Sequence, residues 1–228
     1  MALIASLIRR HPSLPYIVPF GVFVAFLGIA PYLTSIGRWE FPFRIVVLIA
    51  VLWLFSRDAI SLRVSNAAGS VALGLAVFAI WIGPDLLIPG YREHWLFQNF
   101  ITGKLHSSIS RDLLADRMVL TLRCFRAIIL VPIVEELFWR AWLTRWVISP
   151  DFQKVKLGAY TTKAMWITAL LFASEHGPYW EVGLIAGLLY NWWMVRTKSL
   201  GDCILAHAVT NAALSFYVLQ TGKWEYWL

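Results

Sequence analysis

Seven long apolar runs, separated by short polar stretches, make up most of this sequence. A helix crosses the hydrocarbon core of a membrane with about 20 apolar residues, and the lengths of the runs scatter around that value. The pattern therefore predicts an all-α polytopic transmembrane bundle of about seven spans. The predicted spans are residues 14–36, 41–55, 67–88, 118–148, 164–176, 181–195 and 199–220.

One long polar stretch, residues 91–117, interrupts this pattern. Part of it, SISRDLLADRM, has the composition of a short amphipathic helix that lies on a membrane surface. We expect a single membrane domain over residues 1–228. It would consist of N-terminal spans and the amphipathic loop (14–117), followed by a core (118–220) in which charged residues occur inside the spans.

The composition supports a membrane location. Hydrophobic residues make up 59% of the chain and charged residues 14%, whereas soluble domains are about half apolar and about a quarter charged. The net charge of +7 comes from basic residues that lie between the apolar runs. Such residues orient membrane helices, and the sequence contains no nucleic-acid-binding motif. The expected surroundings are therefore the lipid bilayer, with no nucleic acid partner.

Ionisable residues occur inside the predicted span 118–148, in the segment VPIVEELFWRAW. Glu136 and Arg140 are four residues apart and lie on one helix face, so they can pair. Glu135 points about 100° away from Glu136, which leaves its carboxylate free to face a cavity. Pro132 lacks a backbone N–H, so it should free a carbonyl oxygen and can kink the helix beside Glu135.

Two further polar clusters lie in later spans. Phe172 and His176 are four residues apart, as are His207 and Asn211. Each cluster alone has a structural interpretation, because histidine often ends a helix and because histidine and asparagine form hydrogen bonds between membrane helices. Cys203 lies four residues before His207, so a Cys–His thiol protease is a further alternative, although a buried cysteine is usually an inert small hydrophobe.

Three motifs on separate helices, E-E-x-x-x-R, F-x-x-x-H and H-x-x-x-N, follow one another in this order. The ordered set resembles the CPBP family of intramembrane proteases, which includes the type II CAAX prenyl proteases and many bacterial Abi proteins. The segment GLIAGLLYNWWMVRTKSLGDCILAHAVTN is similar to the family's linker between its second and third motifs. The resemblance covers roughly residues 130–214. Length and layout also resemble the exosortase-associated "CAAX prenyl protease-related" subgroup, which implies a bacterial inner membrane.

The resemblance implies an intramembrane endopeptidase that hydrolyses a peptide bond of a membrane-associated protein or peptide, with residues 118–220 as its protease core. Glu135 and His176 match the residues that activate water, and His207 and Asn211 match the pair that holds the oxyanion. The supporting residues of the motifs match Glu136, Arg140 and Phe172. This chemistry requires no cofactor, and the zinc-binding motif HExxH is absent. Zinc at Glu135, His176 and His207 stays an open alternative.

Two other functions compete with proteolysis. A non-catalytic membrane scaffold or bacteriocin-immunity-type protein would use the polar clusters only for packing, and a transporter would use them as a midplane site. A protease needs Glu135, His176, His207 and Asn211 around one water-accessible cavity, whereas a scaffold needs only pairwise bonds. His176 ends one helix while His207 lies near the start of another that begins on the opposite side, so the two must reach a similar depth.

Overall fold

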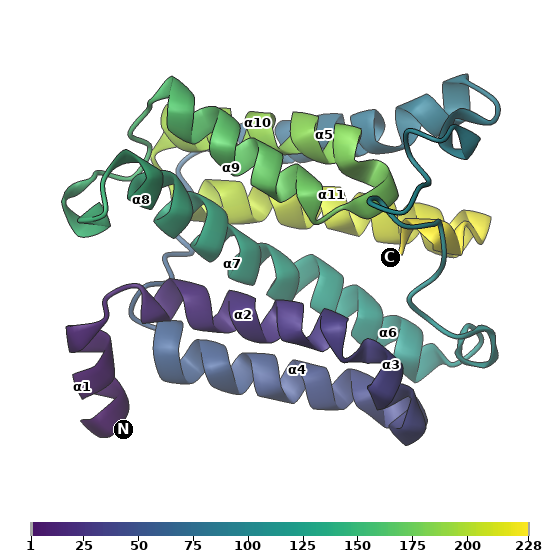
Figure 1. Cartoon of the computed structure of the whole chain (residues 1–228), viewed down its shortest axis with the longest axis horizontal. Helices are drawn as coiled ribbons and strands as arrows, with labels where there is room; N and C mark the ends of the chain where they lie inside the picture. The colour runs from purple at the N-terminus through teal and green to yellow at the C-terminus, as the bar shows by residue number, and fades with distance from the viewer. Residues whose placement is uncertain (1, 228) are drawn as a thin grey trace.

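The computed structural model describes residues 2–227, apart from the side chains of residues 2, 31 and 34. Throughout this part of the chain the regular structure is helical, with no strand and one isolated bridge between Asn99 and Gly103. Figure 1 shows most of the long helices side by side along the long axis of the molecule. The predicted all-α architecture is confirmed.

The helices follow the apolar runs closely. Their bounds are α1 (Ala2–Arg10), α2 (Leu14–Gly28), α3 (Ala30–Leu33), α4 (Glu40–Val51), α5 (Ala67–Leu87), α6 (Arg117–Phe125), α7 (Val131–Glu136), α8 (Thr144–Ile148), α9 (Thr162–Ser174), α10 (Trp180–Thr197) and α11 (Leu200–Thr221). Two π-helical turns, Arg126–Leu130 and Leu137–Leu143, join α6, α7 and α8. Residues 117–148 therefore form one long helix, here called the central helix.

Three helical segments are long and apolar enough to cross a membrane: Ser35–Ser56, Ala67–Leu87 and Leu200–Thr221. A fourth span is formed if the bent pair Leu3–Arg10 and Leu14–Gly28, which meet at 104°, counts as one. The central helix is long enough but carries charged residues, and α9 has only 13 residues. At 1.5 Å per residue α9 is about 20 Å long, which is shorter than the hydrocarbon core. The number seven stays a prediction.

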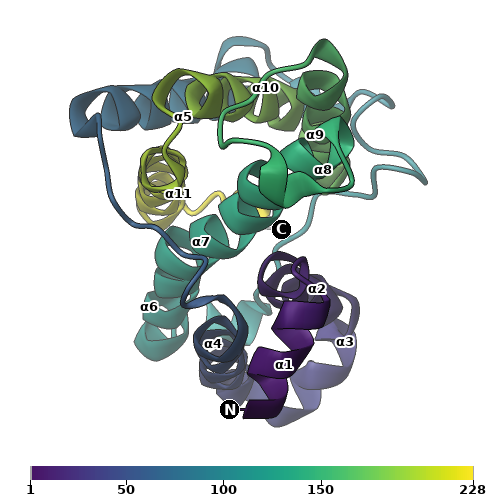
Figure 2. The same cartoon turned by 90° about the vertical axis from the view of Figure 1, so that its left-hand side faces the viewer.

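The central helix separates two groups of helices. Figure 2, seen along the bundle, places α2 and α4 on one side and α5, α9, α10 and α11 on the other. In the second group α11 packs against α5, and α10 packs against α9. Buried apolar side chains from both groups meet the central helix in one core, for example Phe20, Leu48, Leu137 and Tyr190. Side chains of the central helix can therefore reach space on either side.

The contact between α5 and α11 depends on a glycine. A Cβ atom placed on Gly74 would overlap the backbone oxygen of Ala206 and the side chain of Val209. Small residues let membrane helices approach closely, and Gly74 has this role here. Because the two helices lie so close, Thr210 on α11 reaches α5: its Oγ1 donates a hydrogen bond to the Gly74 carbonyl at 2.8 Å.

The start of α11 is tied to the start of α5. Ser199 caps α11 by accepting a hydrogen bond from the Asp202 N–H at 3.2 Å, which is half of a capping box. The Asp202 carboxylate, which is fully buried, turns to α5 instead. It accepts hydrogen bonds from the Ser65 N–H and hydroxyl, the Asn66 N–H and the Ser70 hydroxyl at 2.5–2.9 Å.

Arg44 differs from expectation for a basic residue near a helix end in the membrane. Long basic side chains of membrane helices commonly extend to the interface. The structure instead buries Arg44 at 6% exposure and pairs its Nη2 with Glu40 Oε2 at 2.6 Å. The pairing explains the difference, because Glu40 lies one turn earlier on the same face of α4.

The polar stretch after α5 holds no surface helix. Within residues 106–116 the helical structure is one short 3₁₀ turn, Arg111–Leu113. The Ser107 hydroxyl accepts a hydrogen bond from the Ile109 N–H, and such local bonds compete with helix formation. The stretch is also held in place from outside, because the Ser108 N–H donates to the Trp227 carbonyl at 2.7 Å. The prediction of an amphipathic helix here was wrong.

Candidate active site

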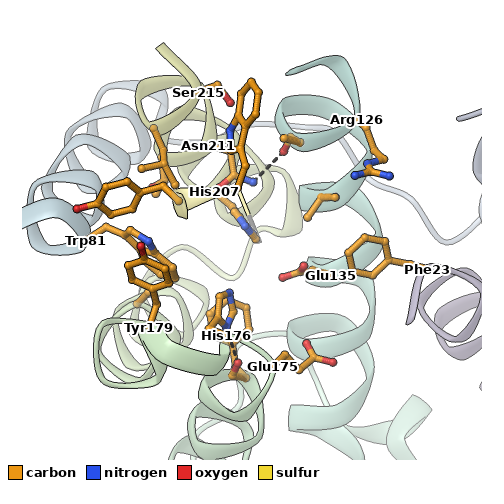
Figure 3. Close-up of a pocket in the computed structure, with 18 of the residues that line it drawn as sticks. Phe23, Trp81, Arg126, Glu135, Glu175, His176, Tyr179, His207, Asn211 and Ser215 are labelled. Carbon is orange, nitrogen blue, oxygen red and sulfur yellow. Dashed lines mark hydrogen bonds between the residues drawn. The ribbon is translucent and has the colours of Figure 1, made fainter. Parts of the chain in front are cut away.

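A cavity of about 190 Å³ lies beside the central helix. The space exceeds the volume of one water molecule several times over, so it can hold several waters. Its walls come from α2, α5, the central helix, α9, α10, α11 and the C-terminal segment. All four residues predicted to carry the chemistry, Glu135, His176, His207 and Asn211, line this one cavity, as Figure 3 shows.

Glu135 is the residue of α7 whose carboxylate faces the cavity (Figure 3). The residue is 6% exposed, and its Oε2 atom is buried without a hydrogen-bond partner among the described residues. A buried polar atom without a partner is rare in a folded protein and needs an explanation. In a cavity that can admit water or substrate, the carboxylate oxygen is available to both.

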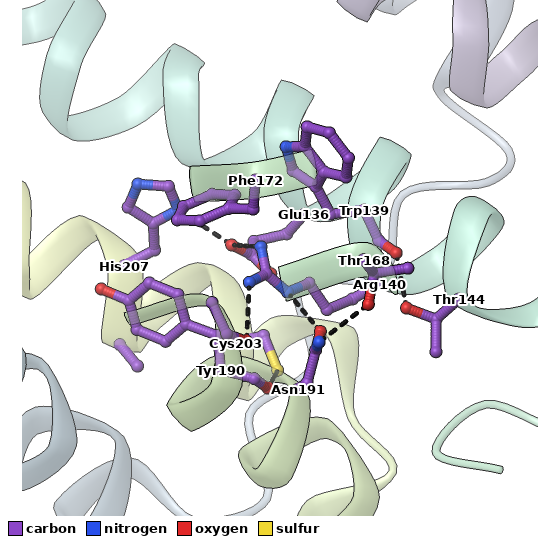
Figure 4. Close-up of polar contacts among 12 residues, drawn as sticks. Glu136, Trp139, Arg140, Thr144, Thr168, Phe172, Tyr190, Asn191, Cys203 and His207 are labelled. Carbon is purple, nitrogen blue, oxygen red and sulfur yellow. Dashed lines mark hydrogen bonds and ion pairs between the residues drawn. The ribbon is translucent and has the colours of Figure 1, made fainter. Parts of the chain in front are cut away.

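Glu136 points away from Glu135 and makes the ion pair that the spacing predicted. Its Oε1 accepts from Arg140 Nη1 at 3.1 Å, and both side chains are buried. Arg140 also donates to Asn191 Oδ1 at 3.2 Å and to the Gly187 carbonyl at 3.3 Å, both on α10. Figure 4 shows this network between the central helix and α10.

Asn191 is a member of this network that sequence reasoning missed. It is 3% exposed, and its Nδ2 donates to the Met165 carbonyl at 3.0 Å and to Thr168 Oγ1 at 2.8 Å, both on α9. Through Asn191, the Arg140 guanidinium is connected to α9 as well as to α10. The available signal was a lone asparagine within the apolar run of the predicted sixth span.

Pro132 determines where Asn211 binds. In the π-helical turn the Val131 N–H donates to the Arg126 carbonyl, five residues back. In the same register the next N–H would serve Ala127, but residue 132 is proline and has no N–H. Asn211 Nδ2 donates to the Ala127 carbonyl instead, at 2.8 Å. The carbonyl oxygen that Pro132 was expected to free is therefore that of Ala127. It holds the Asn211 side chain by accepting one of its two amide N–H groups.

His176 presents one ring nitrogen to the cavity. Its Nδ1 lies 2.7 Å from the Phe172 carbonyl oxygen, which can only accept, so Nδ1 carries the proton of this bond. Nε2 is then the nitrogen left for the cavity, and in the neutral ring it is a proton acceptor. The Trp81 ring on α5 packs edge-on against the His176 ring, with 5.2 Å between the two ring centroids.

His207 is held by two contacts. Its Nδ1 lies 2.9 Å from Glu136 Oε1, so the carboxylate fixes the tautomer and ring orientation. Its ring stacks on Tyr190 at 5.2 Å and 21°. Tyr190 is in turn fixed by a hydrogen bond from its hydroxyl to Thr210 Oγ1 at 2.7 Å. Sequence reasoning missed Tyr190, whose position directly before Asn191 in α10 was the available signal.

The two histidines lie near one aromatic ring, that of Phe172. Phe172, which is 1% exposed, has its ring centroid 4.6 Å from that of His176 and 6.3 Å from that of His207. The Arg140 guanidinium lies on the same ring, 4.6 Å from its centroid. Phe172 therefore packs against both histidines and the Arg140 guanidinium.

The structure bears on two alternatives for these side chains, a Cys–His thiol protease and a zinc site. Cys203 is fully buried, its Sγ lies 3.7 Å from the Tyr190 carbonyl, and it is not among the residues that line the cavity. The geometry therefore gives a Cys–His thiol protease no support. In residues 2–227, Glu135, His176 and His207 do not form a group arranged to hold a metal ion.

Two charged residues in the cavity wall were not among the predicted site residues. Glu175 lines the cavity as an exposed residue next to His176, consistent with a place at the mouth. Arg126, on the central helix, lines it as a buried residue. Neither belongs to a motif, and the spacing of Arg126 from Glu135 does not suggest a shared face on a regular α-helix.

The comparisons with known proteins concern the part of the chain that holds these residues. Residues 117–213 match the family model for Type II CAAX prenyl endopeptidase Rce1-like. No curated protein and no solved structure matches the chain. The matched range contains Glu135, His176, His207 and Asn211 and covers nearly all of the range over which the motifs resemble the CPBP family. The part of the chain that carries the three motifs is therefore similar to the type II CAAX prenyl endopeptidase Rce1-like family.

Proposed function

We propose that the chain is an intramembrane endopeptidase that hydrolyses a peptide bond of a membrane-associated protein or peptide. The observation that carries the proposal is the buried, unpartnered Glu135 oxygen in a cavity that His176, His207 and Asn211 also line. A cluster used only for packing would pair its polar atoms with one another. Glu136 makes such pairs through its Oε1, with Arg140 and His207, although its Oε2 has no partner among the described residues. The described residues give the Glu135 carboxylate no such pair.

The first step is activation of water. Glu135 offers a carboxylate oxygen and His176 offers Nε2, so both can accept a hydrogen bond or a proton from a water molecule in the cavity. The activated water attacks the carbonyl carbon of the peptide bond. The proton taken from water then passes from Glu135 to the leaving nitrogen, so that a carboxylic acid and an amine result.

The second requirement is stabilisation of the oxyanion that forms during attack. Asn211 has one amide N–H in use at Ala127, and its second N–H has no partner among the described residues. His207 has Nδ1 in use at Glu136, so Nε2 is the ring nitrogen left for the cavity, and it donates to the oxyanion when it carries a proton. Loss of one such donor typically lowers kcat by roughly 10²–10³-fold.

We further propose that residues 1–228 form one membrane domain of seven spans in a bacterial inner membrane, with residues 118–220 as the protease core. Large apolar side chains exposed on several helices support a lipid-facing surface, among them Val46, Trp53, Leu75 and Leu170 at 49–64% exposure. The bacterial location rests on the resemblance of the chain's layout to the exosortase-associated subgroup. Labelling of single cysteines placed in each loop, from either side of the membrane, tests the topology.

The test of function compares protein termini in membranes from cells that carry the wild type, Glu135→Gln or Glu93→Gln. Glu93 is an exposed acid outside the cavity, so its variant controls for loss of a charge. We expect specific new termini in the wild type and in Glu93→Gln that disappear in Glu135→Gln. Identical profiles for all three, with both variants inserted and folded, would favour the scaffold alternative.

A further inference from the structure

The loop that follows α5 carries a group of exposed apolar side chains. Residues 94–103 are here called the aromatic loop, and in it Trp95, Phe100 and Ile101 are 70%, 98% and 84% exposed. Phe100 and Ile101 are the two most exposed large apolar side chains among the described residues. Single exposed apolar residues are normal on a protein surface, whereas a group of them marks an interaction site.

Hydrogen bonds within the aromatic loop keep it ordered. The Asn99 side chain accepts from the N–H groups of Ile101 and Thr102, through Oδ1 at 2.8 and 3.0 Å. Its Nδ2 donates to the Trp95 carbonyl at 2.9 Å. The Gly103 N–H closes the turn by donating to the Asn99 carbonyl at 2.9 Å. Because the loop is already ordered, its contact with a partner costs little conformational entropy.

Arg92 fixes the aromatic loop to the helix bundle. Its guanidinium donates to the carboxylates of Asp85 on α5 and Glu181 on α10, at 2.9 and 2.8 Å. The Arg92 carbonyl accepts a hydrogen bond from Gln98 Nε2 in the loop at 2.8 Å. Arg92 itself is 6% exposed. The loop is therefore held at the place where α5 ends and α10 begins.

The end of α5 gives the level of the aromatic loop in a membrane. This candidate span has 21 residues, which at 1.5 Å per residue is about 31 Å, close to the thickness of the hydrocarbon core. Leu86, Leu87 and Ile88 at its end are exposed, so the apolar surface continues from the span toward the loop. Figure 1 shows the loop, in blue, beyond this end of α5. When α5 crosses a membrane, the loop lies at one interface.

The composition of the aromatic loop fits the interface between lipid headgroups and acyl chains. Tryptophan is enriched at membrane interfaces, and residues 94–106 contain no Asp or Glu and one lysine, the exposed Lys104. A lysine beside inserted apolar side chains suits the phosphates of anionic lipids. Lysine is depleted in protein–protein interfaces. A lipid surface therefore fits this loop better than a protein partner does.

We propose that the aromatic loop inserts Trp95, Phe100 and Ile101 into the bilayer interface and anchors this end of the bundle at a fixed depth. Interfacial insertion of this kind reaches roughly 5–10 Å into the boundary between headgroups and acyl chains. The polar stretch 91–117 then contacts the membrane surface through a loop rather than through the helix that the sequence predicted. The anchor is independent of the proposed function, because no residue of the loop lines the cavity.

Fluorescence of an NBD label on a single cysteine, with the protein in lipid nanodiscs, tests the insertion. The label is placed at Phe100→Cys or, as a control, at Lys154→Cys, in a background with Cys124→Ala and Cys203→Ala. Lys154 is an exposed side chain in the loop between α8 and α9. The label at 100 should emit at shorter wavelength than the label at 154 and should lose intensity when nitroxide lipids are added. A nitroxide near the glycerol end of the acyl chain should quench it more than one near the methyl end.

Substitutions within the loop test whether its side chains cause the insertion. With the label at Trp95→Cys, the pair Phe100→Ser and Ile101→Ser should abolish quenching by lipid nitroxides. Tyr160→Ser, which changes an exposed aromatic residue outside the loop, should leave the quenching unchanged. Neither change should alter the melting temperature in detergent, because these side chains are exposed.

Three results would overturn the anchor. The first is emission from the label at 100 that matches the label at 154, since the loop then lies in water. The second is stronger quenching by the nitroxide near the methyl end, since the loop then lies in the acyl core. The third is emission at shorter wavelength without any lipid quenching, since a protein surface, such as a second copy of the chain, then covers the loop.

Discussion

Two adjacent glutamates give the sharpest prediction, because they should respond to the same substitution in opposite ways. Glu136→Gln removes the charge of one partner of a buried ion pair and leaves Arg140, at 1% exposure, with neutral acceptors alone: the new amide oxygen, Asn191 Oδ1 and the Gly187 carbonyl. Removal of one partner from such a pair costs about 3–5 kcal/mol. Glu135→Gln replaces an unpartnered buried carboxylate by a neutral amide of the same shape, so it should cost nothing.

The expected shift in melting temperature follows from the length of the chain. For a protein of 228 residues, about 1 kcal/mol corresponds to about 2–4 °C. Glu136→Gln should therefore lower Tm by about 6–20 °C. Glu135→Gln should melt at or above the wild-type temperature, because a desolvated charge is removed. Both variants should lose cleavage activity, Glu135→Gln through loss of the base and Glu136→Gln through release of His207.

The assay is thermal unfolding of the purified proteins in one detergent at one scan rate, which keeps irreversible steps comparable. Glu40→Gln is a matched control, since Glu40 is the partner of another buried pair at spacing i,i+4 and is not in the cavity wall. It should lower Tm to a similar extent as Glu136→Gln. Equal shifts for Glu135→Gln and Glu136→Gln would refute the assignment of one carboxylate to structure and the other to the cavity.

Three further predictions concern helix contacts and the oxyanion donor. Gly74→Ala should destabilise by about 1–3 kcal/mol, because the new Cβ overlaps a backbone carbonyl of α11. Gly83→Ala on the same helix, where a Cβ meets nothing within 4 Å, should be neutral or slightly stabilising in the same melting experiment. Asn211→Asp should lower kcat by roughly 10²–10³-fold, since it removes the amide donor and places an acceptor against Ala127. Asp202→Asn should lower stability by about 2–3 kcal/mol, because four hydrogen bonds lose their charged acceptor.

Each of these has an outcome that contradicts it. Equal melting of Gly74→Ala and Gly83→Ala would mean that α5 and α11 do not approach as closely as described. A kcat for Asn211→Asp within a few-fold of wild type would remove Asn211 from oxyanion binding. An unchanged Tm for Asp202→Asn would show that the tie between the starts of α5 and α11 contributes little.

The sequence by itself determined the helices and the faces of the key residues. Apolar runs of near-membrane length give helices, because each backbone polar group must find a partner within the same segment. Spacings of four residues place side chains on one face, and so the Glu136–Arg140 pair and the separate direction of Glu135 could be predicted. The ordered motifs also indicated the family that matches residues 117–213.

Only the tertiary structure decided which faces meet. Spacing along one helix does not reveal its neighbours, so Asn191 and Tyr190 on α10 could not be connected to Arg140 and His207 in advance. Arg44 is buried because it pairs with Glu40, although long basic side chains of membrane helices commonly extend to the interface.

The π-helical turns also lay beyond the sequence. Each shifts the register by about 100°, and the first of them brings Arg126 toward the cavity that Glu135 faces. The periodicity used to predict helix faces assumes a regular α-helix, so it fails at this turn. There Pro132 has no N–H to donate, and Asn211 on α11 donates to the Ala127 carbonyl in its place. The residues that could act were visible in the sequence, but their convergence on one cavity depends on contacts between helices.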